Sequence, residues 1–329
     1  ACSPSFLETG PCEDVFEGPA IATCPVPGWE RREYDLVLPA DYDGTTAIPV
    51  VLALHGGGGN KEGAARVTCA SGEPDDTSCL HQHAQANGYA VVFPDGTSGR
   101  LIRRVRTWNA GGGVDEWRCT SGRACEEDVD DIAYFEALLD DLEERVAVDV
   151  DRVYATGLSN GAAMSHRLAC ELSERIAAVA PVGGAMQLTV AAPCAPSRPV
   201  AVLQVHGTED PCWTYQGGPS ECPIGQLDLS LVGVERTLTE WAELLGCDPG
   251  PVEGDLPDPE EDGTRTTRMR WNGCSAEFEH LKIGGGGHAW PDGYAYLKER
   301  TIGVVPRDWG NEVIWAFLGQ QRRQEPGAR

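Results

Sequence analysis

The sequence is poor in positive charge and contains no long apolar segment. It has 26 lysines and arginines against 51 aspartates and glutamates, which gives a formal net charge of −25. A surface this acidic repels nucleic-acid phosphates and anionic membrane surfaces, so the charge disfavours binding to either, and no nucleic-acid partner is expected. The longest apolar stretch, residues 176–192, is interrupted by a proline, two glycines and a glutamine. We therefore expect no transmembrane segment.

The thirteen cysteines lack the repeated C-x-x-C spacing of a zinc site, so no metal site is predicted. Most come instead in couples that bracket loops, a pattern typical of a disulfide-stapled, exported protein. Sequence alone does not determine connectivity. The expected pairs are Cys12–Cys24, Cys69–Cys79, Cys119–Cys125, Cys170–Cys194, Cys212–Cys222 and Cys247–Cys274.

Cys2 is the odd cysteine and lies at the beginning of the chain. A bacterial lipoprotein carries its lipidated cysteine in this position, so Cys2 is a candidate lipid anchor. The alternatives are a free thiol and a pairing with Cys12 or Cys24. Together with the other cysteines, this predicts a secreted, periplasmic or cell-surface protein.

Apolar segments with strand and helix character alternate along the chain, which predicts an α/β fold with a mostly parallel, doubly wound sheet flanked by helices. Strands are expected at residues 32–39, 48–54, 89–93, 153–155, 176–182, 200–205, 265–271 and 277–283. Helices are expected at residues 80–87, 128–146, 162–172, 227–245 and 307–320. We expect one domain over residues 29–320, an extended lead-in over 1–28 and a tail over 321–329. Residues 248–264 form an acidic insertion, interpreted as a solvated loop rather than a cation site.

Residues 157–161 match the pattern G-x-S-x-G between an expected strand and an expected helix. Glycines allow the chain to turn sharply there, and the turn exposes the hydroxyl of Ser159. The sequence therefore predicts that Ser159 is a nucleophile. The alternative is a glycine-rich turn in which the serine only caps the helix.

A serine hydroxyl needs a base to take its proton, and in a doubly wound sheet the base should follow a strand. His288 follows the expected strand 277–283 in a glycine-rich loop, and we predict it to be the base. The other six histidines are assigned to structural His-Gly turns (His55, His206), to surface positions (His81, His83) and to regular elements (His166, His280).

The acid that orients the base is expected after strand 200–205. Asp210 lies there, with Glu209 as the competing candidate. The chain order Ser159, Asp210, His288 is the order of nucleophile, acid and base in α/β-hydrolases. For the negative oxygen of the transition state, we predict the backbone N–H groups of Asn160 and Gly57, with Gly56 as the alternative to Gly57.

Five motifs in this order resemble the secreted polyhydroxybutyrate-depolymerase and feruloyl-esterase family, over most of the chain from about residue 31. They are Leu-His-Gly-Gly-Gly ending at Gly58, Pro-Asp-Gly ending at Gly96, Gly-Leu-Ser-Asn-Gly ending at Gly161, His-Gly-Thr-Glu-Asp ending at Asp210, and Gly-Gly-Gly-His-Ala-Trp-Pro ending at Pro291. The resemblance implies an α/β-hydrolase fold, a Ser–Asp–His triad and no cofactor. It also implies a cysteine pair like Cys247 and Cys274.

We therefore expect an exported serine esterase that acts on feruloyl or acetyl esters of plant polysaccharide, or on polyhydroxyalkanoate-type polyesters. This sequence departs from the family pattern in three ways: some relatives have a cysteine where Gly57 stands, the loop 97–127 carries its own cysteine couple, and Cys212 and Trp213 interrupt the segment after Asp210. The last two departures leave the substrate open, because these loops surround the expected site. Trp108, Trp213 and Trp290 are candidate substrate contacts, with packing as the alternative. Two other functions remain open: a peptidase on the same fold, and a non-catalytic carbohydrate- or polyester-binding protein.

Overall fold

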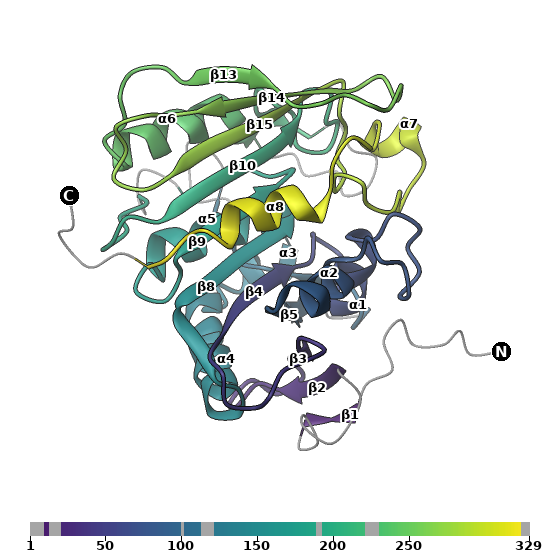
Figure 1. Cartoon of the computed structure of the whole chain (residues 1–329), viewed down its shortest axis with the longest axis vertical. Coiled ribbons are helices and arrows are strands. Elements are labelled where there is room, and N and C mark those ends of the chain that lie inside the picture. Colours follow the sequence, from purple (N-terminus) through teal and green to yellow (C-terminus); the bar gives the residue numbers. More distant parts are fainter. Residues whose placement is uncertain are drawn as a thin grey trace.

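The computed structural model describes residues 10–12, 21–99, 102–112, 122–188, 193–220 and 230–323. Within these ranges, eleven strands form one sheet, which extends from the bottom to the top of Figure 1. In sheet order they are β1 (Gly10–Pro11), β2 (Ile21–Pro25), β3 (Glu33–Val37), β5 (Ala90–Pro94), β4 (Ile48–Leu54), β8 (Val148–Leu158), β9 (Ala178–Val182), β10 (Ala201–Gly207), β15 (Phe278–Gly284), β14 (Arg265–Arg270) and β13 (Val252–Asp255).

The middle of the sheet is parallel, from β5 through β4, β8, β9 and β10 to β15. The outer strands β2, β3, β14 and β13 pair antiparallel with their inner neighbours. Every residue of β4, β5, β9 and β10 is buried. Strands that are apolar on both sides need helices on both faces of the sheet to exclude water.

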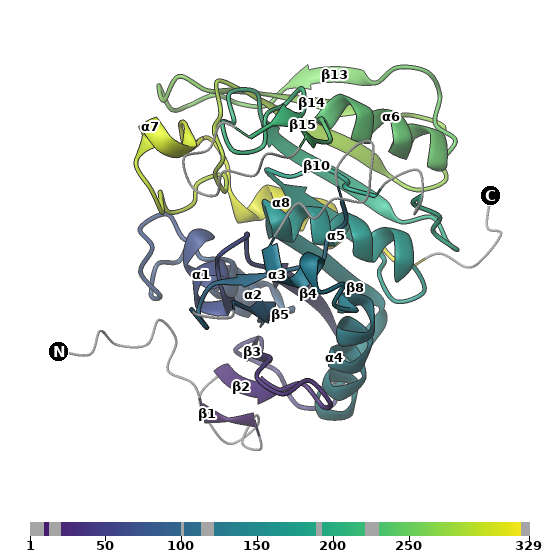
Figure 2. The ribbon, with the colours of Figure 1, turned by 180° about the vertical axis from the view of Figure 1, so that it is seen from behind.

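Helices cover both faces. In Figure 1, α2 (Leu80–Asn87) and α8 (Asn311–Leu318) lie in front of the sheet. In Figure 2, which shows the molecule from behind, α4 (Asp131–Arg145), α5 (Asn160–Glu171) and α6 (Val234–Leu244) lie in front. The short helix α1 (Lys61–Val67) packs against β4 and β5. The predicted α/β fold is therefore confirmed.

Short elements follow the carboxyl ends of three parallel strands. After β5 come the hairpin β6 (Thr97–Ser98) and β7 (Arg106–Thr107) and the helix α3 (Gly122–Glu126). After β10 comes the hairpin β11 (Gly218–Pro219) and β12 (Ser230–Leu231). After β15 comes α7 (Glu299–Ile302). These segments surround the sheet edge at which the predicted site residues lie.

Several element boundaries differ from the sequence-based prediction. The strand predicted at 153–155 is the eleven-residue β8, and the helix predicted from 227 begins at Val234, after the N-cap Gly233. Part of the acidic insertion is the fully exposed edge strand β13 rather than a loop. Part of the lead-in, β2, pairs with β3, so it is the margin of the sheet rather than a separate segment.

Four of the expected disulfides are present, namely Cys12–Cys24, Cys69–Cys79, Cys170–Cys194 and Cys247–Cys274. Cys125 and Cys212 are also disulfide-bonded. Their expected partners, Cys119 and Cys222, lie outside the described residues, as does Cys2. Among the described helices, none combines the length and apolar character needed to span a membrane.

Candidate active site

Ser159 lies at the turn between β8 and α5, with φ 61° and ψ −119°. A non-glycine residue is strained at such a positive φ, and the strain persists only where the surrounding structure fixes it. Here the turn packs tightly on the end of β4. A Cβ atom on Gly157 would lie 2.7 Å from the carbonyl oxygen of Leu54, and one on Gly161 would lie 2.5 Å from it. The half-buried Ser159 therefore occupies a turn with the geometry of a nucleophile elbow.

The loops after the neighbouring strands β10 and β15 bring Asp210 and His288 together. His288 Nδ1–H donates to Asp210 Oδ2 at 2.6 Å, and the backbone N–H groups of Cys212 and Trp213 donate to Asp210 Oδ1 at 2.8 and 2.7 Å. Burial raises the pKa of Asp210, but the charge of His288 and hydrogen bonds from His206 and His288 outweigh it and hold the pKa at about 2. Asp210 is thus ionised at neutral pH.

The Asp210–His288 pair lies beside the elbow. The N–H of Ser159 donates to the carbonyl oxygen of Val182 at 2.9 Å. The next residue, Gly183, lies against the imidazole, because a Cβ atom there would be 3.4 Å from His288 Nδ1. The structure therefore brings the three predicted residues to one edge of the sheet. The competing acid Glu209 is exposed to solvent.

The loop after β4 lies directly on the start of α5, since a Cβ atom on Gly57 would be 3.5 Å from the Cβ of Asn160. The N–H of Gly58 is already bonded to the carbonyl oxygen of Arg106 at 2.8 Å, and that of Gly59 to Gly56 at 3.0 Å. Within the described part of the chain, the N–H groups of Gly57 and Asn160 have no acceptor. These two groups could therefore bind a developing oxyanion.

Trp108 is fully buried and forms hydrogen bonds both to Asn160, at the start of α5, and to His55, in the loop after β4. Its backbone N–H donates to Asn160 Oδ1 at 2.8 Å, and its carbonyl oxygen accepts from Asn160 Nδ2 at 3.1 Å. Its indole N–H donates to the carbonyl oxygen of His55 at 2.9 Å. Trp108 thus ties the start of α5 to the glycine loop that follows His55.

Trp213 and Trp290 are also buried, at 5% and 2% exposure. The indole N–H of Trp213 donates to the carbonyl oxygen of Val232, and that of Trp290 to Asn311 Oδ1, both at 3.0 Å. The expectation that Trp108, Trp213 and Trp290 contact substrate is therefore not supported. Their ring faces and N–H groups are used in packing the loops around the site.

Exposed apolar side chains flank the site at positions that sequence reasoning missed. Tyr296 is 38% exposed, and its hydroxyl donates to the carbonyl oxygen of His288 at 3.2 Å. Val105 is 40% exposed and lies over the glycine loop, 3.9 Å from where a Cβ atom on Gly58 would be. The closeness of Tyr296 to His288 in the sequence was the only signal that could have singled it out.

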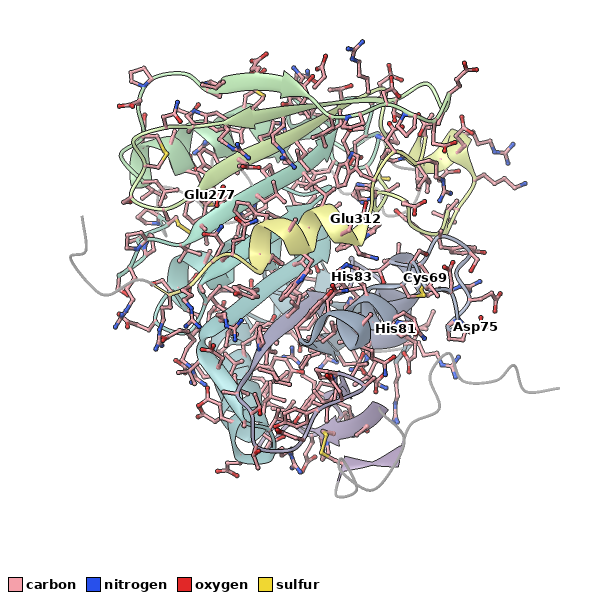
Figure 3. All side chains as sticks on the ribbon, viewed as in Figure 1. Cys69, Asp75, His81, His83, Glu277 and Glu312 are labelled. Carbon is pink, nitrogen blue, oxygen red and sulfur yellow. A yellow bond between two sulfur atoms is a disulfide. The ribbon has the colours of Figure 1, made fainter. Side chains whose placement is uncertain are left out.

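The described residues contain one cluster of three side chains with metal-ligand character: Cys69, Cys79 and His81. Figure 3 labels His81 on α2 and Cys69 close to that helix. Both sulfur atoms are joined in a disulfide, and His81 Nε2–H donates to the carbonyl oxygen of Pro74 at 2.8 Å. The cluster therefore does not fit a metal. His81 was predicted to be a surface residue, but it is buried.

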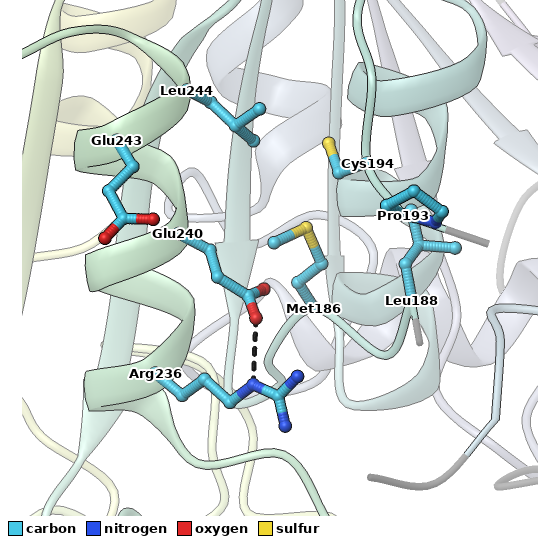
Figure 4. A pocket seen from close by; sticks show the side chains of 8 residues that line it. All are labelled: Met186, Leu188, Pro193, Cys194, Arg236, Glu240, Glu243 and Leu244. Carbon is cyan, nitrogen blue, oxygen red and sulfur yellow. Dashed lines mark hydrogen bonds and ion pairs between the residues drawn. The ribbon is translucent and has the colours of Figure 1, made fainter. Parts of the chain in front are cut away.

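A cavity of about 530 Å³ lies between α6 and the segment that follows β9 (Figure 4). Its apolar part includes Met186 and Leu188, and Arg236 forms an ion pair with Glu240 at 2.8 Å on its α6 side. None of the predicted triad or oxyanion residues lines it. We therefore do not include this cavity in the candidate active site.

No protein-family model matches the chain. Over 266 residues the chain is 26% identical to feruloyl esterase B of Piromyces equi, a match that covers 80% of this chain and 43% of that protein. Over 256 residues it is 27% identical to feruloyl esterase C of Emericella nidulans, covering 78% of this chain and 76% of that protein. The chain thus spans less than half the length of the first relative.

Among solved structures, the acetyl xylan esterase from Aspergillus awamori is similar in fold. The TM-score is 0.55 at 13% identity, and the match covers 92% of this chain and 99% of that chain. At this identity the similarity supports the fold alone. The elbow geometry, the sheet topology and the sequence relatives agree with the five motifs. Together these observations support the predicted resemblance to polyhydroxybutyrate depolymerases and feruloyl esterases with an α/β-hydrolase fold.

Proposed function

We propose that this protein hydrolyses carboxylic esters through an acyl-enzyme on Ser159, with His288 as the base and Asp210 as the acid that orients it. The observation that carries the proposal is the strained Ser159 turn beside the buried pair of His288 and Asp210, whose nitrogen and oxygen are 2.6 Å apart. Esterase names among the sequence relatives support the same reaction class.

In the first half of the reaction, Ser159 Oγ attacks the ester carbonyl while His288 Nε2 takes the hydroxyl proton. Asp210 is ionised, so it stabilises the imidazolium and keeps the Nδ1–H directed toward itself. The N–H groups of Gly57 and Asn160 bind the oxyanion, and each such donor is typically worth about 3 kcal/mol of the barrier. The tetrahedral intermediate collapses when His288 gives its proton to the leaving alcohol.

In the second half, a water molecule attacks the acyl-enzyme. His288 accepts a proton from the water and then returns one to Ser159 as the acid product leaves. Every step uses side chains and backbone groups of this chain together with water. The mechanism therefore needs no cofactor.

We propose that the substrates are feruloyl or acetyl esters of plant polysaccharide, or polyhydroxyalkanoate-type polyesters. The names of the sequence relatives support the first class, and the exposed ring of Tyr296 suits an aromatic acyl group or a polymer chain. We also propose that the protein is exported, because its disulfides would not persist in a reducing cytosol.

A fluorophosphonate probe tests the nucleophile directly. We expect covalent labelling of the wild-type protein, with the modified peptide containing Ser159, and no labelling of Ser159→Ala at the same concentration. Absence of labelling in the folded wild-type protein would refute the proposed reaction. A rate comparison on methyl ferulate, acetylated xylan, polyhydroxybutyrate film and p-nitrophenyl esters of increasing chain length would then identify the substrate class.

A further inference from the structure

Behind Asp210, buried side chains form a hydrogen-bonded chain that the mechanism above does not use. Starting from α6, Trp241 Nε1–H donates to His166 Nδ1 at 3.0 Å, and His166 Nε2–H donates to Gln204 Oε1 at 2.8 Å. The amide of Gln204 lies 3.5 Å from His206 Nδ1. These four side chains are at most 1% exposed. This hydrogen-bonded network of side chains therefore runs through the core from α6, across α5, to β10.

The positions of the hydrogen atoms in this hydrogen-bonded network follow from the partner groups that can only donate or can only accept. An indole N–H can only donate, so His166 Nδ1 accepts and its Nε2 carries the hydrogen. One end of the Gln204 side-chain amide lies 2.8 Å from the carbonyl oxygen of Gly184. Because a carbonyl oxygen can only accept, that end is the amide nitrogen. The carbonyl oxygen of Trp213, 2.7 Å from His206 Nε2, can only accept, so His206 Nδ1 is left to accept from the amide nitrogen of Gln204, 3.5 Å away. His206 consequently carries its hydrogen on Nε2.

The Nε2–H of His206 points at the turn that holds the acid. It donates to the carbonyl oxygen of Trp213 at 2.7 Å and lies 3.4 Å from Asp210 Oδ2. This is the same carboxylate oxygen that accepts from His288 Nδ1. Asp210 is thus held by two backbone N–H groups on one oxygen and faced by two imidazoles at the other. A buried carboxylate is stable as an anion only when it is surrounded by donors in this way.

We propose that His206 is a positioning residue for the triad: a second imidazole, fixed in its Nε2–H form by Gln204 and His166, that holds the turn from Asp210 to Trp213. It touches neither substrate nor the reacting atoms and acts only through the Asp210–Trp213 turn. The inference rests on the proposed function. Because His166 lies on α5, the helix that Ser159 precedes as its N-cap, the same hydrogen-bonded network joins the nucleophile's helix to the acid's turn.

His280 offers a matched control for His206. It is also fully buried, on the neighbouring strand β15, and it also makes two hydrogen bonds, at 2.9 Å each, to the carbonyl oxygen of Gln204 and the hydroxyl of Tyr215. It has no contact with Asp210 among its hydrogen bonds. Replacing either histidine by leucine removes one buried imidazole and two hydrogen bonds, so the two variants should lose comparable stability.

The test compares kcat, KM and melting temperature of the wild type, His206→Leu and His280→Leu on one p-nitrophenyl ester. We expect His206→Leu to lower kcat about tenfold to a hundredfold, the factor that corresponds to one hydrogen bond to a charged group. KM should not change, because His206 does not contact substrate. His280→Leu should keep the wild-type kcat. Equal kcat losses in both variants, or a loss confined to KM, would overturn the proposal.

A second pair of variants covers the case in which His206→Leu does not fold. His206→Gln places an amide donor near the former Nε2 position, whereas the shorter side chain of His206→Asn reaches only the former Nδ1 position. We expect kcat to be higher in His206→Gln, and equal values in the two would refute the positioning role. Failure of the proposed function would appear differently, as absent turnover in the wild type.

Discussion

At the scale of single residues, two adjacent carboxylates have opposite environments. Asp210 is buried and bonded to His288, whereas Glu209 is exposed. We predict that Asp210→Asn lowers kcat by about four orders of magnitude with the fold retained, because the amide favours the wrong imidazole tautomer. Circular dichroism and p-nitrophenyl ester kinetics measure both properties. Glu209→Gln is the control and should keep wild-type turnover; a similar loss in this variant would contradict the assignment of the acid.

Among the described residues, Tyr296 is an exposed aromatic side chain that contacts the base, whereas the three tryptophans predicted to bind substrate are buried. Tyr296→Ala should raise KM for methyl ferulate about two- to tenfold, since an aromatic contact is worth about 0.5–1.5 kcal/mol. KM for p-nitrophenyl acetate serves as the reference. Tyr296→Phe keeps the ring and should bind methyl ferulate like the wild type. An unchanged KM in Tyr296→Ala would exclude Tyr296 as a substrate contact.

At the scale of elements, the site depends on how closely β4, β8 and α5 approach one another. Gly161 touches the backbone at the end of β4, and a Cβ atom there would lie 2.5 Å from Leu54 O and 2.7 Å from His55 O. Backbone atoms cannot move aside cheaply. Close packing at the catalytic edge therefore requires a residue without a side chain in the first turn of α5, in addition to the strained backbone at Ser159.

We predict that Gly161→Ala destabilises the protein by about 1–3 kcal/mol, the usual cost of overpacking, and lowers kcat, because the added methyl group displaces the elbow from the glycine loop. Chemical denaturation and steady-state kinetics test both effects. Gly254→Ala is the control, since a Cβ atom at this exposed β13 position meets nothing within 4 Å. Full activity in Gly161→Ala would show that the close approach is not needed.

At the scale of the whole molecule, two disulfides lie at opposite ends of the parallel strands. Cys247–Cys274 joins the end of α6 to the turn that precedes β15. Cys69–Cys79 lies near the catalytic edge, where the amide of Asn311 donates to the carbonyl oxygens of Thr68 and Ser78 at 2.8 and 2.6 Å. Asn311 also accepts from Trp290, two residues beyond His288.

Removing either disulfide should lower the melting temperature, because a native disulfide is typically worth about 2–5 kcal/mol. We predict that only the double variant Cys69→Ser/Cys79→Ser also lowers kcat, since its loop supports Trp290 and the base. Cys247→Ser/Cys274→Ser is the matched control. Differential scanning calorimetry and ester kinetics measure the two effects, and equal turnover in both double variants would contradict the coupling through Asn311.

Much of this organisation could be predicted from local sequence. Runs such as Ile48–Leu54 are apolar without interruption, and a run of this kind is stable in an α/β protein only as a strand buried on both faces. The glycines around Ser159 predict a sharp turn because other residues do not fit there. Ends of elements were less predictable: Gly233, and not residue 227, marks the start of α6, and β13 lies in a segment without an apolar pattern.

The sequence by itself determined the alternation of strands and helices, the elbow at Ser159 and the chain order of Ser159, Asp210 and His288. Each of these depends on residues close together in the chain or on the order in which strands follow one another. Tertiary structure decided that Trp108 ties the glycine loop to α5 and that His206 faces Asp210. These contacts depend on how distant side chains pack and share hydrogen bonds, which no local pattern specifies.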